Sequence, residues 1–117
     1  MLKAGDVFYL PDWFGGHLNF VLKVLPDNSL IICNFTDLNR SKDKTCVVTV
    51  NELECLTKDS AAYFQGTYHC ETDMQIEALE RQIGSYRKPL SVKLLARLQQ
   101  GALDSPHTSE FIKDLLK

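Results

Sequence analysis

The hydrophobic and polar positions of this chain follow two periods, one before about residue 72 and another after it. In the first part, short apolar runs are separated by Pro, Gly, Asn and Asp, which is the pattern of short β-strands joined by turns. The segment Pro26-Asp27-Asn28-Ser29 predicts a hairpin turn. Gly66 is expected to mark a bulge. The predicted strands cover residues 6–10, 18–25, 30–35, 45–50 and 61–69.

After residue 72 the apolar positions recur at helical spacing. Thr72 or Asp73 is expected to cap the first helix, and Gly84 to stop it. Ser105, which precedes a proline, or Thr108 is expected to cap the last helix. Two predicted helices cover residues 72–84 and 91–103, and the third begins at Ser105 or Thr108.

These elements predict an α+β fold. Five short, closely spaced strands are typical of a small antiparallel barrel, so we expect an SH3-like β-barrel in residues 1–71. Three helices are expected to follow it in residues 72–117. With 117 residues, the chain fits a single domain, 1–117, whose core is large enough to fold alone.

The composition is that of an ordinary globular protein, with 44% hydrophobic and 24% charged residues. No apolar run approaches the roughly 18 residues that a membrane span needs, and the first residues do not resemble a signal peptide. We therefore predict a cytoplasmic protein with no membrane partner. The net charge of −2 argues against broad affinity for nucleic acid.

Local clusters of basic residues nevertheless suggest contacts with phosphate groups. Arg40 opens the loop Arg-Ser-Lys-Asp-Lys, and Lys58 and the pair Arg87-Lys88 are further candidates. The alternative is that these are solvated loop charges. Four cysteines lack the two-to-four-residue spacing of a zinc site, which favours reduced, structural thiols.

The strongest chemical candidate is a histidine behind two glycines, Gly15-Gly16-His17, at the start of an apolar strand. An imidazole titrates near neutral pH and serves as general acid or base, and glycine allows a ligand to approach the backbone closely. Thr36 ends the next strand and offers a hydroxyl. The alternatives are that His17 only makes a hydrogen bond at the start of the strand, and that the Thr36 side chain makes a hydrogen bond to the backbone.

Two further pairs of residues suggest that this candidate site binds a nucleotide. Lys58 and Ser60 precede the last predicted strand and would donate to a phosphate, and Trp13 and Phe14 would stack on an exposed base. The alternatives are that Lys58 and Ser60 belong to an ordinary turn, and that Trp13 and Phe14 close one end of the barrel. The common phosphate-loop, zinc-protease and serine-hydrolase motifs are absent, and the three histidines are too scattered to propose a metal site, so we expect no metal and no cofactor.

The order of these elements resembles the PemK/MazF toxin family over residues 4–70. The resemblance rests on Gly5-Asp6-Val7 before a strand, on an apolar hairpin that ends in Thr36, and on the turn from Leu56 to Ser60. It implies a compact SH3-like barrel, usually a dimer, that cleaves RNA without a metal through the RNA's own 2′-hydroxyl. It also implies an antitoxin partner.

Thr36 matches the family's threonine, which helps to polarise the scissile phosphate. The family's catalytic arginine has no counterpart, and His17 occupies roughly its place. We therefore expect an endoribonuclease for single-stranded RNA in which His17 handles the proton. Thr36, Ser60 and Lys58 would hold the phosphate. The competing hypothesis is a non-catalytic binding module, an inhibitor or adaptor that recognises a protein.

Overall fold

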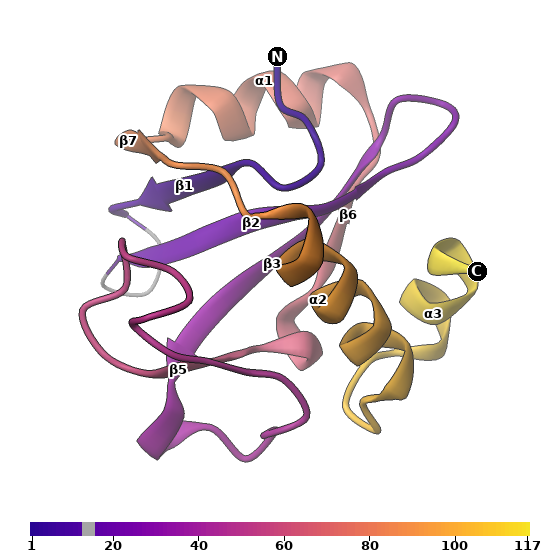
Figure 1. Ribbon diagram of the computed structural model, residues 1–117. Coiled ribbons are helices and arrows are strands. Elements are labelled where there is room, and N and C mark those ends of the chain that lie inside the picture. Colours follow the sequence, from indigo (N-terminus) through magenta and orange to yellow (C-terminus); the bar gives the residue numbers. More distant parts are fainter. Residues whose placement is uncertain (13–15) are drawn as a thin grey trace.

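The structure is a computed structural model that describes residues 1–12 and 16–117 (Figure 1). Strands come first along the chain, with two short 3-10 turns, η1 and η2, among them, and the helices follow, with one strand between α1 and α2. In chain order the elements are β1 (Val7–Leu10), β2 (His17–Val24), β3 (Leu30–Asp37), η1 (Leu38–Arg40), β4 (Val47–Val48), β5 (Ser60–Ala62), η2 (Phe64–Gly66), β6 (Tyr68–Cys70), α1 (Asp73–Gln82), β7 (Ser85–Arg87), α2 (Val92–Asp104) and α3 (Glu110–Leu116).

The strands form one antiparallel sheet of order β4-β5-β3-β2-β1-β7, and β6 adds to β3 beside β5. Long β2 and β3 are its centre. Within the described residues, β4 and β7 end the sheet and do not pair with each other, so the sheet is open. The α+β class is confirmed, but a closed barrel is not observed.

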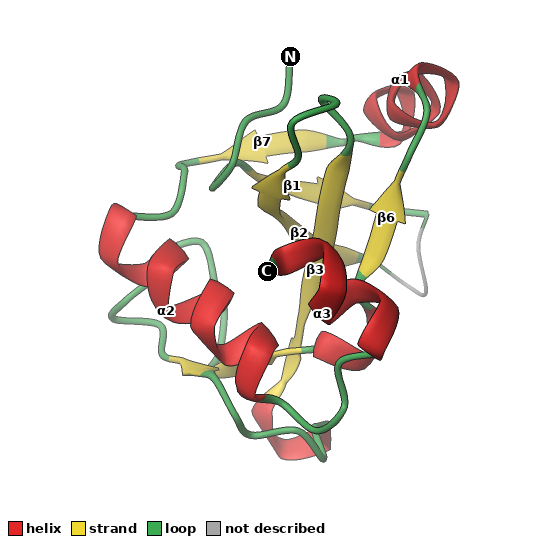
Figure 2. Cartoon of the chain, turned by 90° about the vertical axis from the view of Figure 1, so that its right-hand side faces the viewer, coloured by secondary structure: helices red, strands yellow, loops and turns green. Residues whose placement is uncertain are grey.

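Both faces of the central hairpin are covered, which explains why its strands read as nearly continuous apolar runs. Ile31 and Cys33 of β3 alternate with Leu30 and Ile32. The first pair joins the core shared with α2 and α3, and the second joins a smaller cluster that includes Leu79 of α1. Figure 2 shows α2 and α3 together on one side of the sheet and α1 apart from them.

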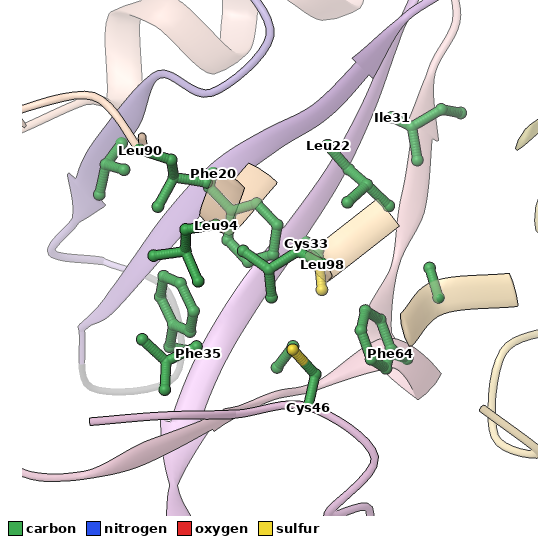
Figure 3. Close-up of a cluster of buried hydrophobic side chains, with 14 of the residues drawn as sticks. Phe20, Leu22, Ile31, Cys33, Phe35, Cys46, Phe64, Leu90, Leu94 and Leu98 are labelled. Atoms are coloured by element: carbon green, nitrogen blue, oxygen red, sulfur yellow. The ribbon is translucent and has the colours of Figure 1, made fainter. Parts of the chain in front are cut away.

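The larger core forms where α2 packs on the hairpin. Leu98 is fully buried, and it lies with Leu94 against the aromatic residues Phe20 and Phe35 (Figure 3). These two rings stack with centroids 4.7 Å apart. Side chains from both the strand half and the helical half of the chain therefore build one core.

The first three predicted strands are confirmed with small shifts of their ends, and so are the first two helices. Thr72 caps α1 in a full capping box with Gln75, and Ser91 caps α2. The last helix begins after a cap at Ser109, so the prediction of Ser105 or Thr108 is wrong. Ser105 instead ends α2.

Two predictions about strands are wrong. The expected strand 61–69 is broken into β5, η2 and β6, and Gly66 lies in η2 rather than in a bulge. A Cβ there would lie 2.6 Å from the Tyr63 ring, so the turn needs glycine. The second error is β7, a strand in the part expected to be purely helical, which pairs with β1. The expected strand 45–50 shortens to β4.

An ion pair ties α2 to the loop between β4 and β5. Arg97 lies 2.5 Å from the Glu52 carboxylate and also donates to the Val47 carbonyl. The Arg97 guanidinium lowers the pKa of Glu52 to about 2, with help from the Thr49 N–H.

Among the helices of the described residues, none is long and apolar enough to cross a membrane.

The basic loop from Arg40 to Lys44, predicted either to contact phosphate or to be solvated, is partly buried. The Asp43 side chain accepts hydrogen bonds from the Ser105 hydroxyl at 2.6 Å and from the Thr45 hydroxyl and N–H. Burial alone would raise the pKa of Asp43, but these hydrogen bonds outweigh it and lower the pKa below its usual range. Asp43 thus anchors the loop to the end of α2.

We expect Asp43→Asn to destabilise the fold at neutral pH by about 1–3 kcal/mol, because the buried charge and one of its two acceptor oxygens are lost. A depressed pKa gives stability that is present above the unfolded pKa and is lost as pH falls through the folded pKa. The gap between wild type and variant should therefore shrink below about pH 4. Urea unfolding at several pH values measures this, and a gap independent of pH would contradict it.

Candidate functional site

An open cleft of about 310 Å³ lies at the end of the central hairpin, where β2 begins and β3 leaves toward β5. In Figure 1 this is the left side of the molecule, where the start of β2 lies near the loop between β4 and β5. The cleft brings together most of the predicted site residues. It is lined by Tyr9, Gly16, His17, Leu18, Phe35, Thr36, Asp37, Cys55, Leu56, Thr57, Lys58, Ser60 and Arg87.

The register of the hairpin, continued past its last pair, places His17 and Thr36 across from each other. Asn19 pairs with Asn34, and two further residues along each antiparallel strand bring His17 opposite Thr36. Directly opposite residues project from the same face of a sheet. Both residues line the cleft, as the candidate site predicted from the sequence requires.

The neighbouring pair, Asn19 with Asn34, belongs to the closer kind of cross-strand pair. Val21 exchanges backbone hydrogen bonds with the β1 side, at Gly5 N and Asp6 O. The main-chain groups of alternate residues in a strand point in the same direction. His17 and Asn19, which lie four and two residues before Val21, therefore also turn their main-chain groups toward β1 and not toward β3. Such non-hydrogen-bonded pairs have Cα atoms only about 4.5 Å apart.

The His17 ring is half-buried and fixed at one nitrogen. Its Nδ1 lies 3.3 Å from the Phe35 carbonyl oxygen. A carbonyl oxygen only accepts, so this contact requires the proton on Nδ1. In the neutral ring Nε2 then keeps a lone pair, and Nε2 has no partner among the described residues. That is the form a general base needs.

The two predicted hydroxyl donors differ in their freedom. Thr36 is half-buried, pairs with Ala61 of β5, and its hydroxyl has no protein partner within the described residues. The Ser60 hydroxyl, by contrast, is buried and donates to the Lys58 carbonyl at 3.0 Å. Ser60 thus shapes the turn that holds Lys58, while Thr36 remains available to a ligand.

Lys58 reaches the cleft as half of an ion pair. Its ammonium lies 3.0 Å from the Asp37 carboxylate. The N–H of Asn39 is the main cause that lowers the pKa of Asp37, and the Lys58 ammonium lowers it further. Asp37 is therefore ionised at neutral pH and offsets the charge that the sequence assigned to phosphate binding.

Arg87 is the second cation of the cleft. It comes from β7, is exposed, donates to the Ser85 hydroxyl and lies over the Tyr9 ring at 5.8 Å. A Cβ on Gly16 would lie 1.9 Å from the Tyr9 hydroxyl, and its φ is +95°, so this position needs glycine. The side chains of Tyr9 and Arg87 project from the face of the sheet opposite to that of His17. The cleft is therefore lined by residues from both faces.

All four cysteines are free thiols, and three are buried. Cys55 is half-buried at the cleft, where burial raises the pKa of its thiol, and the Arg87 charge partly offsets this rise. A thiol with a raised pKa is a poor nucleophile. In the described part of the chain, no group of His, Cys, Asp and Glu is arranged to hold a metal ion.

Not every predicted site residue reaches the cleft. Arg40 lies in η1 and does not line it. Trp13 and Phe14 lie outside the described residues, so their stacking role stays a prediction. The sequence reading missed Asp37 and Tyr9, although Asp37 directly follows Thr36.

A larger groove, of about 520 Å³, lies between α1 and the N-terminal segment. Its walls combine apolar side chains with three carboxylates, and none of its lining residues is Lys, Arg or His. Carboxylates repel phosphate groups, so this groove does not suit the predicted ligand. The lining of this groove is Met1, Leu2, Val24, Asn28, Leu30, Asp73, Ile76, Glu77 and Glu80.

The ion pair in the cleft makes a direct prediction. In Lys58→Met, the pKa of Asp37 should rise toward its ordinary value but stay below it, because the Asn39 N–H remains. A carboxyl-carbon NMR titration of Asp37 in both proteins measures this. An unchanged pKa would show that the pair does not form in solution.

Comparison of the chain with protein-family models, with curated proteins and with solved structures finds no match in any of the three. The resemblance to PemK/MazF toxins therefore stays a prediction from the sequence.

Proposed function

We propose that the protein is a metal-independent endoribonuclease that cleaves single-stranded RNA through the 2′-hydroxyl of its substrate. One observation carries the proposal: His17 and Thr36 line the same open cleft, with a free lone pair on one residue and a free hydroxyl on the other. A base and a phosphate-directed donor are the minimum that this reaction needs.

In the proposed reaction, His17 Nε2 takes the proton of the 2′-hydroxyl. The 2′-oxygen attacks the adjacent phosphorus, and the bond to the 5′-oxygen of the next nucleotide breaks. The departing oxygen takes a proton from solvent, and His17 returns its proton to solvent. The products are a 2′,3′-cyclic phosphate and a 5′-hydroxyl, so no metal-bound water is consumed.

Thr36 and the cations of the cleft act on the phosphate. The Thr36 hydroxyl donates to a non-bridging oxygen, whose negative charge grows in the transition state. Arg87 supplies a permanent positive charge, whereas the charge of Lys58 is shared with Asp37. Arg87 and Lys58 would together replace the positive charge of the arginine that the family motif places roughly at the position of His17.

An open cleft favours a flexible, single-stranded substrate, because unstacked bases can turn toward aromatic side chains such as Tyr9. With the resemblance to PemK/MazF toxins, the proposal extends to an SH3-like origin of the sheet, a homodimer, an antitoxin partner and a cytoplasmic location. These extensions rest on the sequence motifs.

The second candidate is a non-catalytic module that binds a protein. The Asp37 carboxylate favours it, because a negative charge in the cleft weakens phosphate binding, and Ser60 is committed to the backbone. In that case the cleft would bind a basic or neutral segment of a partner and would leave RNA intact.

A cleavage assay on a mixed RNA pool in EDTA tests the nuclease. We expect wild type to release fragments that end in 2′,3′-cyclic phosphate, and His17→Ala to be slower by about 10²–10⁴-fold, the usual contribution of a general base. His107→Ala is the matched control, because His107 is exposed and lies away from the cleft. It should cleave like wild type.

Equal rates for His17→Ala and His107→Ala would remove His17 from the mechanism. Intact RNA with all three proteins would reject the nuclease and favour the binding module. RNA with 2′-O-methyl groups should resist cleavage, and its cleavage would contradict attack by the 2′-oxygen.

A further inference from the structure

We infer that Asn19 and Asn34 are positioning residues that hold His17 in the tautomer and place required for proton transfer. The inference rests on the proposed function for its kinetic consequence. It rests on the contacts of the hairpin for its structural part.

The two asparagines form the next cross-strand pair behind His17 and Thr36. They lie on the same face of the hairpin, since residues two apart along a strand share a face. The four residues therefore make a short polar ladder on a hairpin that is otherwise apolar over its buried length.

Both asparagines contact the main chain that carries the site. Asn19 Nδ2 donates to the His17 carbonyl oxygen at 3.2 Å. Asn34 Nδ2 donates to the Phe35 carbonyl oxygen at 3.3 Å, and this is the oxygen that lies 3.3 Å from His17 Nδ1. One asparagine thus fixes the backbone of His17, and the other fixes the acceptor of its ring.

Burial of the Asn19 amide is costly for the fold. Asn19 is fully buried and Asn34 is 8% exposed, and the Asn19 Oδ1 atom has no hydrogen-bond partner among the described residues. A buried acceptor without a partner destabilises the folded state, and apolar residues fill such strand positions without that penalty. Stability alone therefore does not account for Asn19.

A role in positioning accounts for it. The Phe35 carbonyl oxygen accepts a hydrogen bond only from a ring nitrogen that carries a proton. A fixed acceptor therefore selects the Nδ1–H tautomer of His17 and leaves the lone pair on Nε2. If the acceptor or the His17 backbone shifts, the ring is free to change tautomer or to rotate. Either change removes the base from the 2′-hydroxyl.

The test replaces each asparagine by leucine, a side chain of similar size without polar atoms. Asn51→Leu is the control, because Asn51 is exposed in the turn after β4 and is not a lining residue of the cleft. Three quantities are measured: the urea midpoint, the His17 tautomer by long-range 1H–15N NMR, and kcat and KM for an RNA oligonucleotide.

We expect Asn19→Leu to keep or raise the urea midpoint, because the orphan acceptor is gone. In both variants His17 should change from a predominant Nδ1–H form to a mixture of tautomers. The kcat should fall by about 10–100-fold, as expected for a misplaced catalytic group, with KM changed by less than about twofold. Asn51→Leu should match wild type in all three.

Wild-type kcat and tautomer in both folded variants would overturn the inference. If wild type cleaves RNA and the variants cleave equally well, positioning fails and the nuclease stands. If the tautomer changes but wild type does not cleave RNA, the nuclease fails and the structural role stands. Asn19→Ala repeats the test without steric demand, should leucine lower the midpoint.

Discussion

The candidate site depends on one constraint, the register of the β2–β3 hairpin. The turn at its closed end pairs Val24 with Leu30, and the register then shifts by one residue between Val21 and Lys23. Without that irregularity, the same turn would place His17 opposite Asp37 instead of Thr36. A one-residue slip moves every side chain of a strand to the other face, so the bulge decides which polar groups meet.

The fold keeps this hairpin rigid by covering both of its faces and leaves only its open end to solvent. Helix α2 brings Leu94 and Leu98 to one face, and α1 covers part of the other. Strand β7 then adds Arg87 to the cleft from the C-terminal half of the chain. The site therefore draws on both the strand half and the helical half of the chain, although its two central residues lie on adjacent strands.

The sequence predicted the parts of the structure that depend on local pattern. A hairpin with His17 at its start and Thr36 at its end follows from apolar runs around a Pro-Asp-Asn-Ser turn, and the Thr72 cap follows from helix chemistry. What it missed depends on contacts between distant segments. Strand β7 has no apolar alternation of its own and exists only by pairing with β1, and Asp43 is buried only because Ser105 meets it. In the same way, Lys58 looks like a free cation until Asp37 is placed beside it.

The proposed function requires that His17 and Thr36 bind one RNA linkage together, with His17 at the 2′-oxygen and Thr36 at the phosphate. NMR mapping with an uncleavable, 2′-O-methylated single strand of RNA tests this claim most directly. We predict that the oligonucleotide shifts the His17 ring and the Thr36 amide and methyl resonances at the same concentration, and leaves His107 unchanged. Shifts confined to the groove beside α1, or at only one of the two residues, would contradict the account.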